Sequence, residues 1–212
     1  MVIAIDGPAG AGKSSVARGV AAALGYTYLD SGAMYRSVAL AALRGGTDPD
    51  DPNEMRELAR SVRIEAGNGT VKLDGADVSE AIRSAEVTRA ASHVAVHPGV
   101  REAMVKRQKA LLNGGRYVAE GRDIGTVVSP DAALKVFLTA SDDERAKRRA
   151  AQTGEAQDAV LTSQRRRDAR DREREHGALR AAADAVQIDT TGIELDEVVA
   201  RVVELARERG LS

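Results

Sequence analysis

Residues 7–14 read GPAGAGKS and stand between a short apolar run, residues 2–5, and a stretch with helical periodicity, residues 14–24. A strand, a glycine-rich loop and a helix in this order turn backbone N–H groups inward around phosphate oxygens. The helix N-terminus adds partial positive charge at the same place. In this pattern Lys13 reaches β/γ-phosphates and Ser14 offers a hydroxyl to Mg²⁺. An ordinary turn would leave the Gly-Lys-Ser order unexplained, so the motif predicts a nucleoside triphosphate site.

Short apolar runs alternate with longer amphipathic stretches along much of the chain. This alternation is typical of a parallel sheet flanked by helices, here an α/β fold of the P-loop NTPase type. The predicted strands are residues 2–5, 26–29, 116–119, 133–138 and 185–188. The predicted helices include residues 14–24, a segment ending at Gly45-Gly46, residues 87–96 and 100–112, a helix opened by the capping pair Ser141 and Glu144, and a last helix through residues 195–205.

Two segments depart from this rhythm. Apolar and polar residues alternate over 62–66 and again over 71–73, with a Gly-Asn-Gly turn between them and Asp-Gly after them. This pattern predicts a small antiparallel β insert. Residues 152–158 are polar and lack helical periodicity, which indicates a short mobile lid.

Composition excludes several classes of protein. The chain has 212 residues, enough for one α/β domain that buries roughly 70% of its unfolded surface. Its net charge is −1 and only five residues are aromatic, so neither a basic field nor stacking platforms favour nucleic acid. The chain has no cysteine, which excludes disulfides and Cys-ligated zinc. Without a leader or a membrane-length apolar run, we expect a cytoplasmic protein, and we expect a monomer.

Polar residues follow every predicted strand. In open parallel sheets, ligands bind outside the carboxyl ends of the strands. The ends at residues 30–31 and 122–123 would lie beside the phosphate loop, and we favour a functional role for them. The ends at residues 139–141 and 189–191 fit ordinary polar loops.

A basic cluster surrounds the predicted lid, with eleven Lys or Arg residues between Arg145 and Arg180. Arg167, Asp171 and Arg174 are spaced i, i+4, i+7 and share a helix face. A solvated helix with internal ion pairs has the same charge pattern. A transferring phosphoryl group, however, spreads charge over three oxygens that guanidinium groups stabilise. Together with the phosphate loop, the cluster favours phosphate chemistry.

The chain resembles the bacterial cytidylate kinases over residues 1–209, through the motifs GPAGAGKS, DSGAMYR, SHVAVHPGVR, EGRDIGTVV and RDARDRER in this order. The first motif is common to P-loop proteins, whereas DSGAMYR and EGRDIGTVV are more specific. The resemblance implies phosphoryl transfer from ATP to CMP or dCMP with Mg²⁺ as cofactor. It implies a single kinase domain, residues 1–212, with a core of residues 1–36, 100–149 and 168–212, a nucleoside monophosphate insert of residues 37–99 and a lid of residues 150–167.

The resemblance also implies individual roles. ATP would be held by Gly7, Pro8, Ala9, Gly10, Ala11, Gly12, Lys13, Ser14 and Ser15. The monophosphate would be held by Ser31, Arg36, Ser92, Arg101, Arg122, Asp123, Arg167, Asp171 and Arg174. The catalytic residues would be Lys13, Arg122 and Arg167, with Ser14 as the metal ligand. Roles stay open for Arg145, Arg148 and Arg149, which flank the lid, and for Asp30, which is either catalytic or a turn cap.

The residues themselves are compatible with this chemistry. Cytosine carries a donor amine at C4 and an unprotonated N3, so a serine hydroxyl and an arginine at Ser92 and Arg101 can distinguish it from uracil. The acceptor phosphate supplies the nucleophilic oxygen, so direct in-line transfer needs only alignment, charge compensation and exclusion of water.

Three alternatives remain open from the sequence. The first is a kinase of the same fold with UMP, AMP or a non-nucleotide acceptor. The second is a P-loop switch or partner-binding protein, against which the missing N-K-x-D base-reading motif counts. The third is a nucleic-acid-binding module that uses the basic cluster, against which the balanced charge counts.

Overall fold

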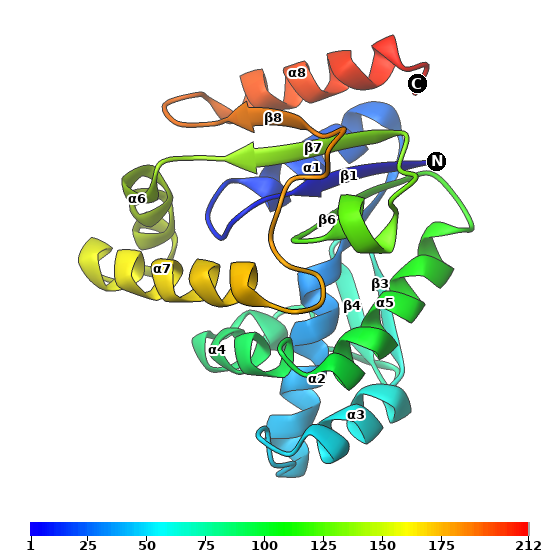
Figure 1. The fold of residues 1–212 in the computed structure, drawn as a ribbon, viewed down its shortest axis with the longest axis vertical. Helices are drawn as coiled ribbons and strands as arrows, with labels where there is room; N and C mark the ends of the chain where they lie inside the picture. Colours follow the sequence, from blue (N-terminus) through cyan, green and yellow to red (C-terminus); the bar gives the residue numbers. More distant parts are fainter. Residues whose placement is uncertain (212) are drawn as a thin grey trace. The chain divides into compact units, whose positions relative to one another are not determined.

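The computed structural model describes residues 1–211 and divides the chain into two compact units. The first unit contains Met1–Thr27 and the chain from Arg116 onward, and the second contains Tyr28–Gly115. Figure 1 shows the elements of both units. Among residues 1–211, no helix combines the length and hydrophobicity that a transmembrane span requires.

A parallel sheet forms the centre of the first unit, which confirms the predicted fold class. β1 (Val2–Asp6) pairs with β6 (Tyr117–Gly121) on one side and with β7 (Leu134–Thr139) on the other. β8 (Val186–Asp189) pairs with β7, and β2 (Thr27–Asp30) completes the order β2-β6-β1-β7-β8. Every residue of β1 is buried, as expected for a central strand covered on both faces.

All five strands end one or two residues later than the apolar runs predict. Asp6 shows the reason, because it continues the ladder with Gly121 on one side and Phe137 on the other. The apolar pattern ends at the first polar side chain, whereas the backbone hydrogen bonds between strands continue past it. The functional residues at the strand ends are therefore held in the sheet itself.

Four helices belong to the first unit: α1 (Lys13–Leu24), α6 (Asp142–Thr153), α7 (Gln157–Glu173) and α8 (Leu195–Glu208). α1 packs against α8 so closely that a Cβ on Gly19 would lie 2.7 Å from Val199 Cγ2. The predicted cap at Ser141 is confirmed, since its Oγ accepts a hydrogen bond from Glu144 N at 3.2 Å.

Residues 152–158, which the sequence indicates as a lid without helical periodicity, are largely helical, because they form part of a helical hairpin (Figure 1). α6 continues to Thr153 and α7 begins at Gln157, so only residues 154–156 connect the two helices. Apolar periodicity fails here because the buried face of α7 is mostly polar. It consists of Val160, Gln164, Asp168 and Asp171.

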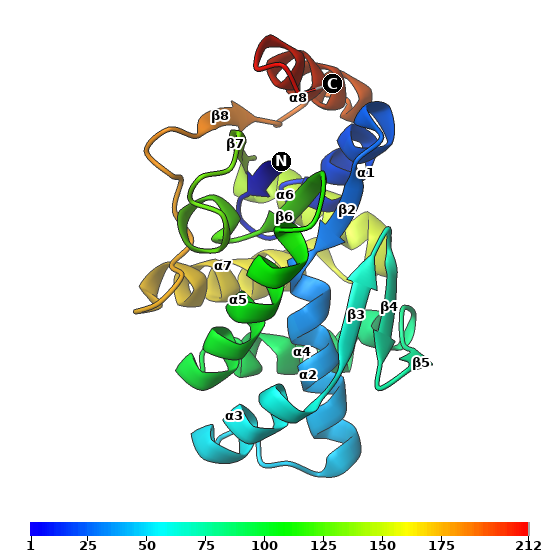
Figure 2. The same ribbon diagram turned by 90° about the vertical axis from the view of Figure 1, so that its right-hand side faces the viewer.

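The second unit contains the remaining elements (Figure 2). Its helices are α2 (Ser31–Gly45), α3 (Pro52–Ser61), η1 (Ala81–Arg83), α4 (Ala85–Val94) and α5 (Pro98–Leu112). The predicted antiparallel insert is confirmed as β3 (Ile64–Gly67), β4 (Thr70–Leu73) and β5 (Ala76–Asp77). The sequence missed α3, which buries only Met55 and Ala59 and so lacks a wide apolar stripe.

This second unit is larger than the insert predicted at residues 37–99. Its core cluster joins Met34 and Val38 of α2 to Val71 of β4 and to Val100 and Met104 of α5. Because one apolar core includes α2 and α5 together, both helices belong to the same unit as the antiparallel sheet. The finer division into core, insert and lid remains a prediction.

Asp6, at the end of β1, fixes the turn that follows β6. Its two carboxylate oxygens accept hydrogen bonds from Ile124 N at 2.9 Å and Gly125 N at 2.7 Å, at the start of the π-helical turn η2 (Ile124–Val128). Burial raises the pKa of Asp6 to about 6, although the two amides act in the opposite direction. The carboxylate therefore orients the turn, although burial of its negative charge is unfavourable.

This raised pKa predicts a pH dependence of stability. A carboxyl whose folded pKa exceeds its ordinary value of 3.8 stabilises the fold below that pH, and the contribution is lost as pH rises through about 6. The difference corresponds to about 3 kcal/mol. We compare the free energies of unfolding of the wild type and of Asp6→Asn. Between pH 4 and pH 7, the wild-type value should fall relative to the variant by about 3 kcal/mol. Denaturant titrations at both pH values measure it, and a difference that stays constant or grows would contradict the assignment.

Candidate active site

The loop between β1 and α1 can form only with glycine at particular positions. Gly7, Gly10 and Gly12 have φ angles of 151°, 79° and 86°. A Cβ on Gly7 would lie 2.2 Å from the carbonyl oxygen of Leu138 in β7. The loop therefore wraps tightly at the carboxyl end of the sheet, before the first turn of α1.

Lys13 is the first residue of α1, and its side chain turns back into this loop. Its Nζ donates a hydrogen bond to the carbonyl oxygen of Pro8 at 2.7 Å, and the residue is only 7% exposed. Burial, together with the nearby cations of Arg122 and Arg167, lowers the pKa of Lys13 to about 7. Positive groups thus lie close enough to Lys13 to disfavour its charged form.

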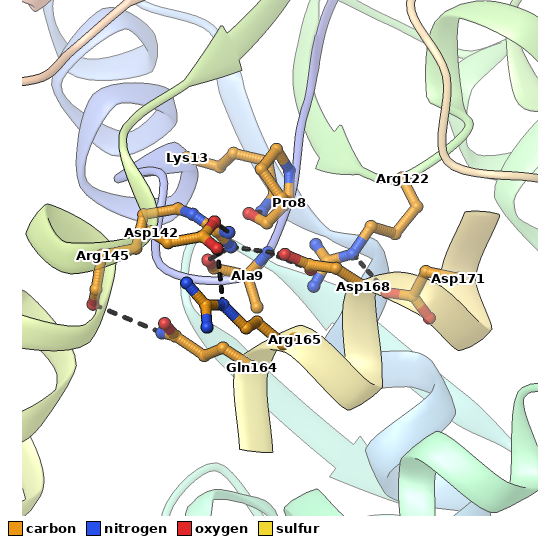
Figure 3. A network of polar contacts seen from close by, with 10 residues as sticks. All are labelled: Pro8, Ala9, Lys13, Arg122, Asp142, Arg145, Gln164, Arg165, Asp168 and Asp171. Carbon is orange, nitrogen blue, oxygen red and sulfur yellow. Dashed lines mark hydrogen bonds and ion pairs between the residues drawn. The ribbon is translucent and has the colours of Figure 1, made fainter. Parts of the chain in front are cut away.

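Arg122, Asp171 and Arg174 form one buried ion-pair group. Arg122 follows β6, and its Nε donates to Asp171 Oδ2 at 2.8 Å. Arg174, at the end of α7, donates to the other oxygen of Asp171. Burial would raise the pKa of Asp171, but the cations of Arg122 and Arg174 hold it below its usual range. Figure 3 shows Asp171 and Asp168 projecting from α7 towards this region.

The three arginines without predicted roles differ in their surroundings. Arg145 is 3% exposed and donates to the carbonyl oxygen of Ala9 at 2.8 Å, so it contacts the phosphate loop directly. Arg148 pairs with Glu144 and donates to the carbonyl oxygen of Thr190 at 2.6 Å. Arg149 has only a long contact with Gln152 on its own helix.

The remaining predicted donor residues are placed as follows. Ser14 is the second residue of α1 and is half-buried, whereas Ser15 is exposed. Residues 1–211 contain no group of three or more His, Asp or Glu side chains that could hold a metal ion. Mg²⁺ commonly takes one or two protein ligands and completes its shell with water and substrate phosphates. The hydroxyl of Ser14 beside a phosphate loop fits an ion that arrives with the nucleotide.

In the second unit, Ser31 and Arg36 lie in the first two turns of α2. The carboxylate of Asp30 caps this helix by accepting from Ala33 N at 2.9 Å, and it pairs with Arg36 at 2.7 Å. Asp30 therefore acts here as a cap and as an anchor for Arg36. The Nε of Arg36 is buried and has no hydrogen-bond partner among residues 1–211, which leaves a donor available for an anion.

Ser92 and Arg101, the residues predicted to face the base, lie on α4 and α5 and are both nearly buried. The Oγ of Ser92 has a long contact of 3.5 Å with the carbonyl oxygen of Thr88. The guanidinium of Arg101 lies 5.7 Å from the ring centroid of Tyr35, within the range of a cation–π contact. Since α2 packs against both α4 and α5, the structure brings the predicted residues of this unit onto neighbouring helices.

Two carboxylates of the first unit are not indicated by the sequence pattern. Asp6 directly follows the first apolar run, and in the structure it neighbours Asp123 and holds the turn after it. Asp168 was not selected, although it is 1% exposed and contacts the phosphate loop. Its position three residues before Asp171, on the same helix face, was the signal available in the sequence.

Comparisons with known proteins agree with this geometry. The family model for cytidylate kinase matches residues 3–208. The cytidylate kinase of Solibacter usitatus is 47% identical over 99% of this chain and 93% of its own length. The cytidylate kinase of Geobacillus kaustophilus is 48% identical over 98% of this chain and 96% of its own. In a bifunctional pantoate ligase/cytidylate kinase of a Synechococcus species, 48% identical, the match covers 98% of this chain and 40% of that protein.

A similarity in fold alone extends to a more distant protein. The crystal structure of an uncharacterized protein from Eubacterium ventriosum superposes with a TM-score of 0.56, at 13% identity, over 98% of each chain. The family model and the relatives near 47% identity cover nearly all of this sequence. On these grounds, the chain belongs to the cytidylate kinase family.

Proposed function

We propose that this chain transfers a phosphoryl group from ATP to CMP or dCMP, giving ADP and CDP or dCDP. The observation that carries the proposal is the convergence of Lys13, Arg122 and Arg167 on a loop shaped by three glycines with positive φ. Clustered cations that disfavour the charge of the buried Lys13 favour a polyanion as their ligand. Membership of the cytidylate kinase family supports CMP as the acceptor.

The residues of the first unit suit the donor side of the reaction. The amides of Gly7–Ser15 and the N-terminus of α1 would bind the β- and γ-phosphates, with Lys13 moving from Pro8 to the transferring group. Arg122 and Arg167 would compensate the charge that spreads over the equatorial oxygens. Asp171 and Arg174 hold Arg122 in place for this role.

Magnesium is the cofactor that this arrangement implies. Ser14 would provide its protein ligand, and the remaining ligands would be phosphate oxygens and water. The ion would supply positive charge that compensates the donor phosphates. The chain's own contribution is to align the acceptor oxygen with the donor phosphorus and to exclude water, without a nucleophilic side chain.

The second unit suits the acceptor. Ser31 and Arg36 would bind the phosphate of CMP, since Arg36 is anchored by Asp30 and keeps a buried Nε donor. Ser92 and Arg101 would contact the cytosine, and the first unit would contribute the predicted carboxylates Asp123 and Asp171. A site that accepts from the C4 amine and donates to N3 rejects uracil by leaving its own polar groups unpaired.

The acceptor is tested by coupled ADP release with CMP, dCMP, UMP and AMP at equal concentrations. We expect kcat/KM for CMP or dCMP to exceed that for UMP and AMP by at least about 100-fold, the range that a hydrogen-bonding pocket provides. Turnover of UMP or AMP at an equal or higher rate would reject the proposed acceptor. ADP release without any acceptor as the main activity would instead indicate a hydrolytic P-loop switch.

Lys13→Ala tests the donor site. The substitution removes a charge used mainly during transfer, so we expect kcat to fall by about 100-fold or more. Circular dichroism and thermal unfolding should show a folded protein. Lys147→Ala on the exposed face of α6 is the matched control and should retain wild-type kcat. Near-normal turnover by Lys13→Ala would contradict the assignment.

Arg101→Ala tests the acceptor site. Because a buried guanidinium in contact with Tyr35 is removed, we expect KM for CMP to rise by about 10-fold or more, with KM for ATP within about 2-fold. Arg44→Ala, at the exposed end of α2, provides the control. A loss of ATP affinity with CMP affinity intact would mean that the two sites are reversed.

A further inference from the structure

The α6–α7 hairpin is attached to the phosphate loop through one buried carboxylate, Asp168. Its Oδ1 accepts a hydrogen bond from Ala9 N at 3.2 Å, and its Oδ2 accepts one from Arg145 at 2.5 Å. The same nitrogen of Arg145 donates to the carbonyl oxygen of Ala9 at 2.8 Å. Both polar groups of Ala9 are thus bound by the hairpin, one by each member of an ion pair (Figure 3).

The next residue of the loop is in direct contact with the same two helices. A Cβ on Gly10 would lie 2.7 Å from Nε2 of Gln164 in α7 and 3.0 Å from Cβ of Arg145 in α6. The Nε2 of Gln164 in turn donates to the carbonyl oxygen of Arg145 at 3.3 Å. The loop backbone thus packs directly against Gln164 and Arg145, so we expect a shift of either helix to displace Ala9 and Gly10.

Stability alone is a weak explanation for this ion pair. Burying both Asp168 and Arg145 removes two charges from water, a penalty that apolar residues of similar size avoid. Arg145 already has a second partner, Asp142, whose side chain is 42% exposed and, within residues 1–211, forms ion pairs with Arg145 and Arg165 but not with the loop. What Asp168 adds is the contact with Ala9, which specifies the position of the loop.

We propose that Asp168 is a positioning residue for phosphoryl transfer. Through Arg145 and Ala9 it holds the first half of the phosphate loop in the conformation that binds the donor, and it makes donor affinity depend on the α6–α7 hairpin. The proposal rests on the proposed placement of ATP in the loop. Because Asp168 contacts the loop proposed to bind ATP, its substitution should weaken ATP binding and leave CMP affinity unchanged.

The test compares Asp168→Ala, Arg145→Met and the double variant Arg145→Met/Asp168→Leu with the wild type. KM for ATP, KM for CMP and kcat are measured, and thermal unfolding confirms that each protein is folded. We expect KM for ATP to rise by about 10-fold or more in each variant, with KM for CMP within about 2-fold. Because the two residues act as one unit, KM for ATP should rise no further in the double variant than in either single variant.

Asp142→Asn is the matched control, since it removes the partner of Arg145 that does not reach the loop. We expect its KM for ATP to stay within about 2-fold of wild type. The double variant guards against unfolding, because it leaves no buried charge without a partner. A folded double variant with wild-type KM for ATP would mean that the pair is only structural, and it would overturn the proposal. An equal rise of KM for ATP and KM for CMP would overturn it as well.

Lys13→Ala, measured in parallel, separates this proposal from the proposed function. Loss of turnover in Lys13→Ala together with wild-type ATP parameters in the Asp168 and Arg145 variants would overturn only the role of Asp168. Near-normal turnover in Lys13→Ala would show that the donor is not bound at this loop, and the proposal for Asp168 would fail with it.

Discussion

Positive charge gathered around the phosphate loop is the constraint on which the structure of the first unit depends. Lys13, Arg122 and Arg167 lie close enough for the two arginines to lower the pKa of the lysine, beyond the effect of burial itself. Such a cluster is costly unless anions compensate it. In the protein alone, carboxylates supply part of that compensation, and a polyphosphate would supply the rest.

Three buried carboxylates organise this region, each through a different contact. Asp6 orients the turn after β6, Asp171 holds Arg122 and Arg174, and Asp168 joins Arg145 to the backbone of Ala9. In each case an acidic group fixes an element that carries or contacts a residue predicted to bind phosphate. Under the proposed function, the cations would be oriented before the substrate arrives, which is the preorganisation that electrostatic catalysis requires.

The predictability of each part follows from the range of its interactions. The strand, loop and helix of residues 2–24 were predictable because glycine geometry and apolar runs are local. α7 was misjudged at its start because its buried face carries amide and carboxylate groups, and Asp168 was overlooked because its partner Ala9 is 159 positions away. The predicted site residues, monomeric state and cytoplasmic location remain predictions, whereas the fold and the family are confirmed.

The central claim is that the loop amides and the surrounding cations bind the phosphates of the donor. Hydrogen exchange of residues 7–14 with and without magnesium tripolyphosphate tests it most directly, because this probe carries no base or sugar. The account predicts slower exchange in this segment at saturation, with the antiparallel strands at residues 64–77 unchanged. Binding demonstrated by calorimetry with no change in exchange at residues 7–14 would contradict it.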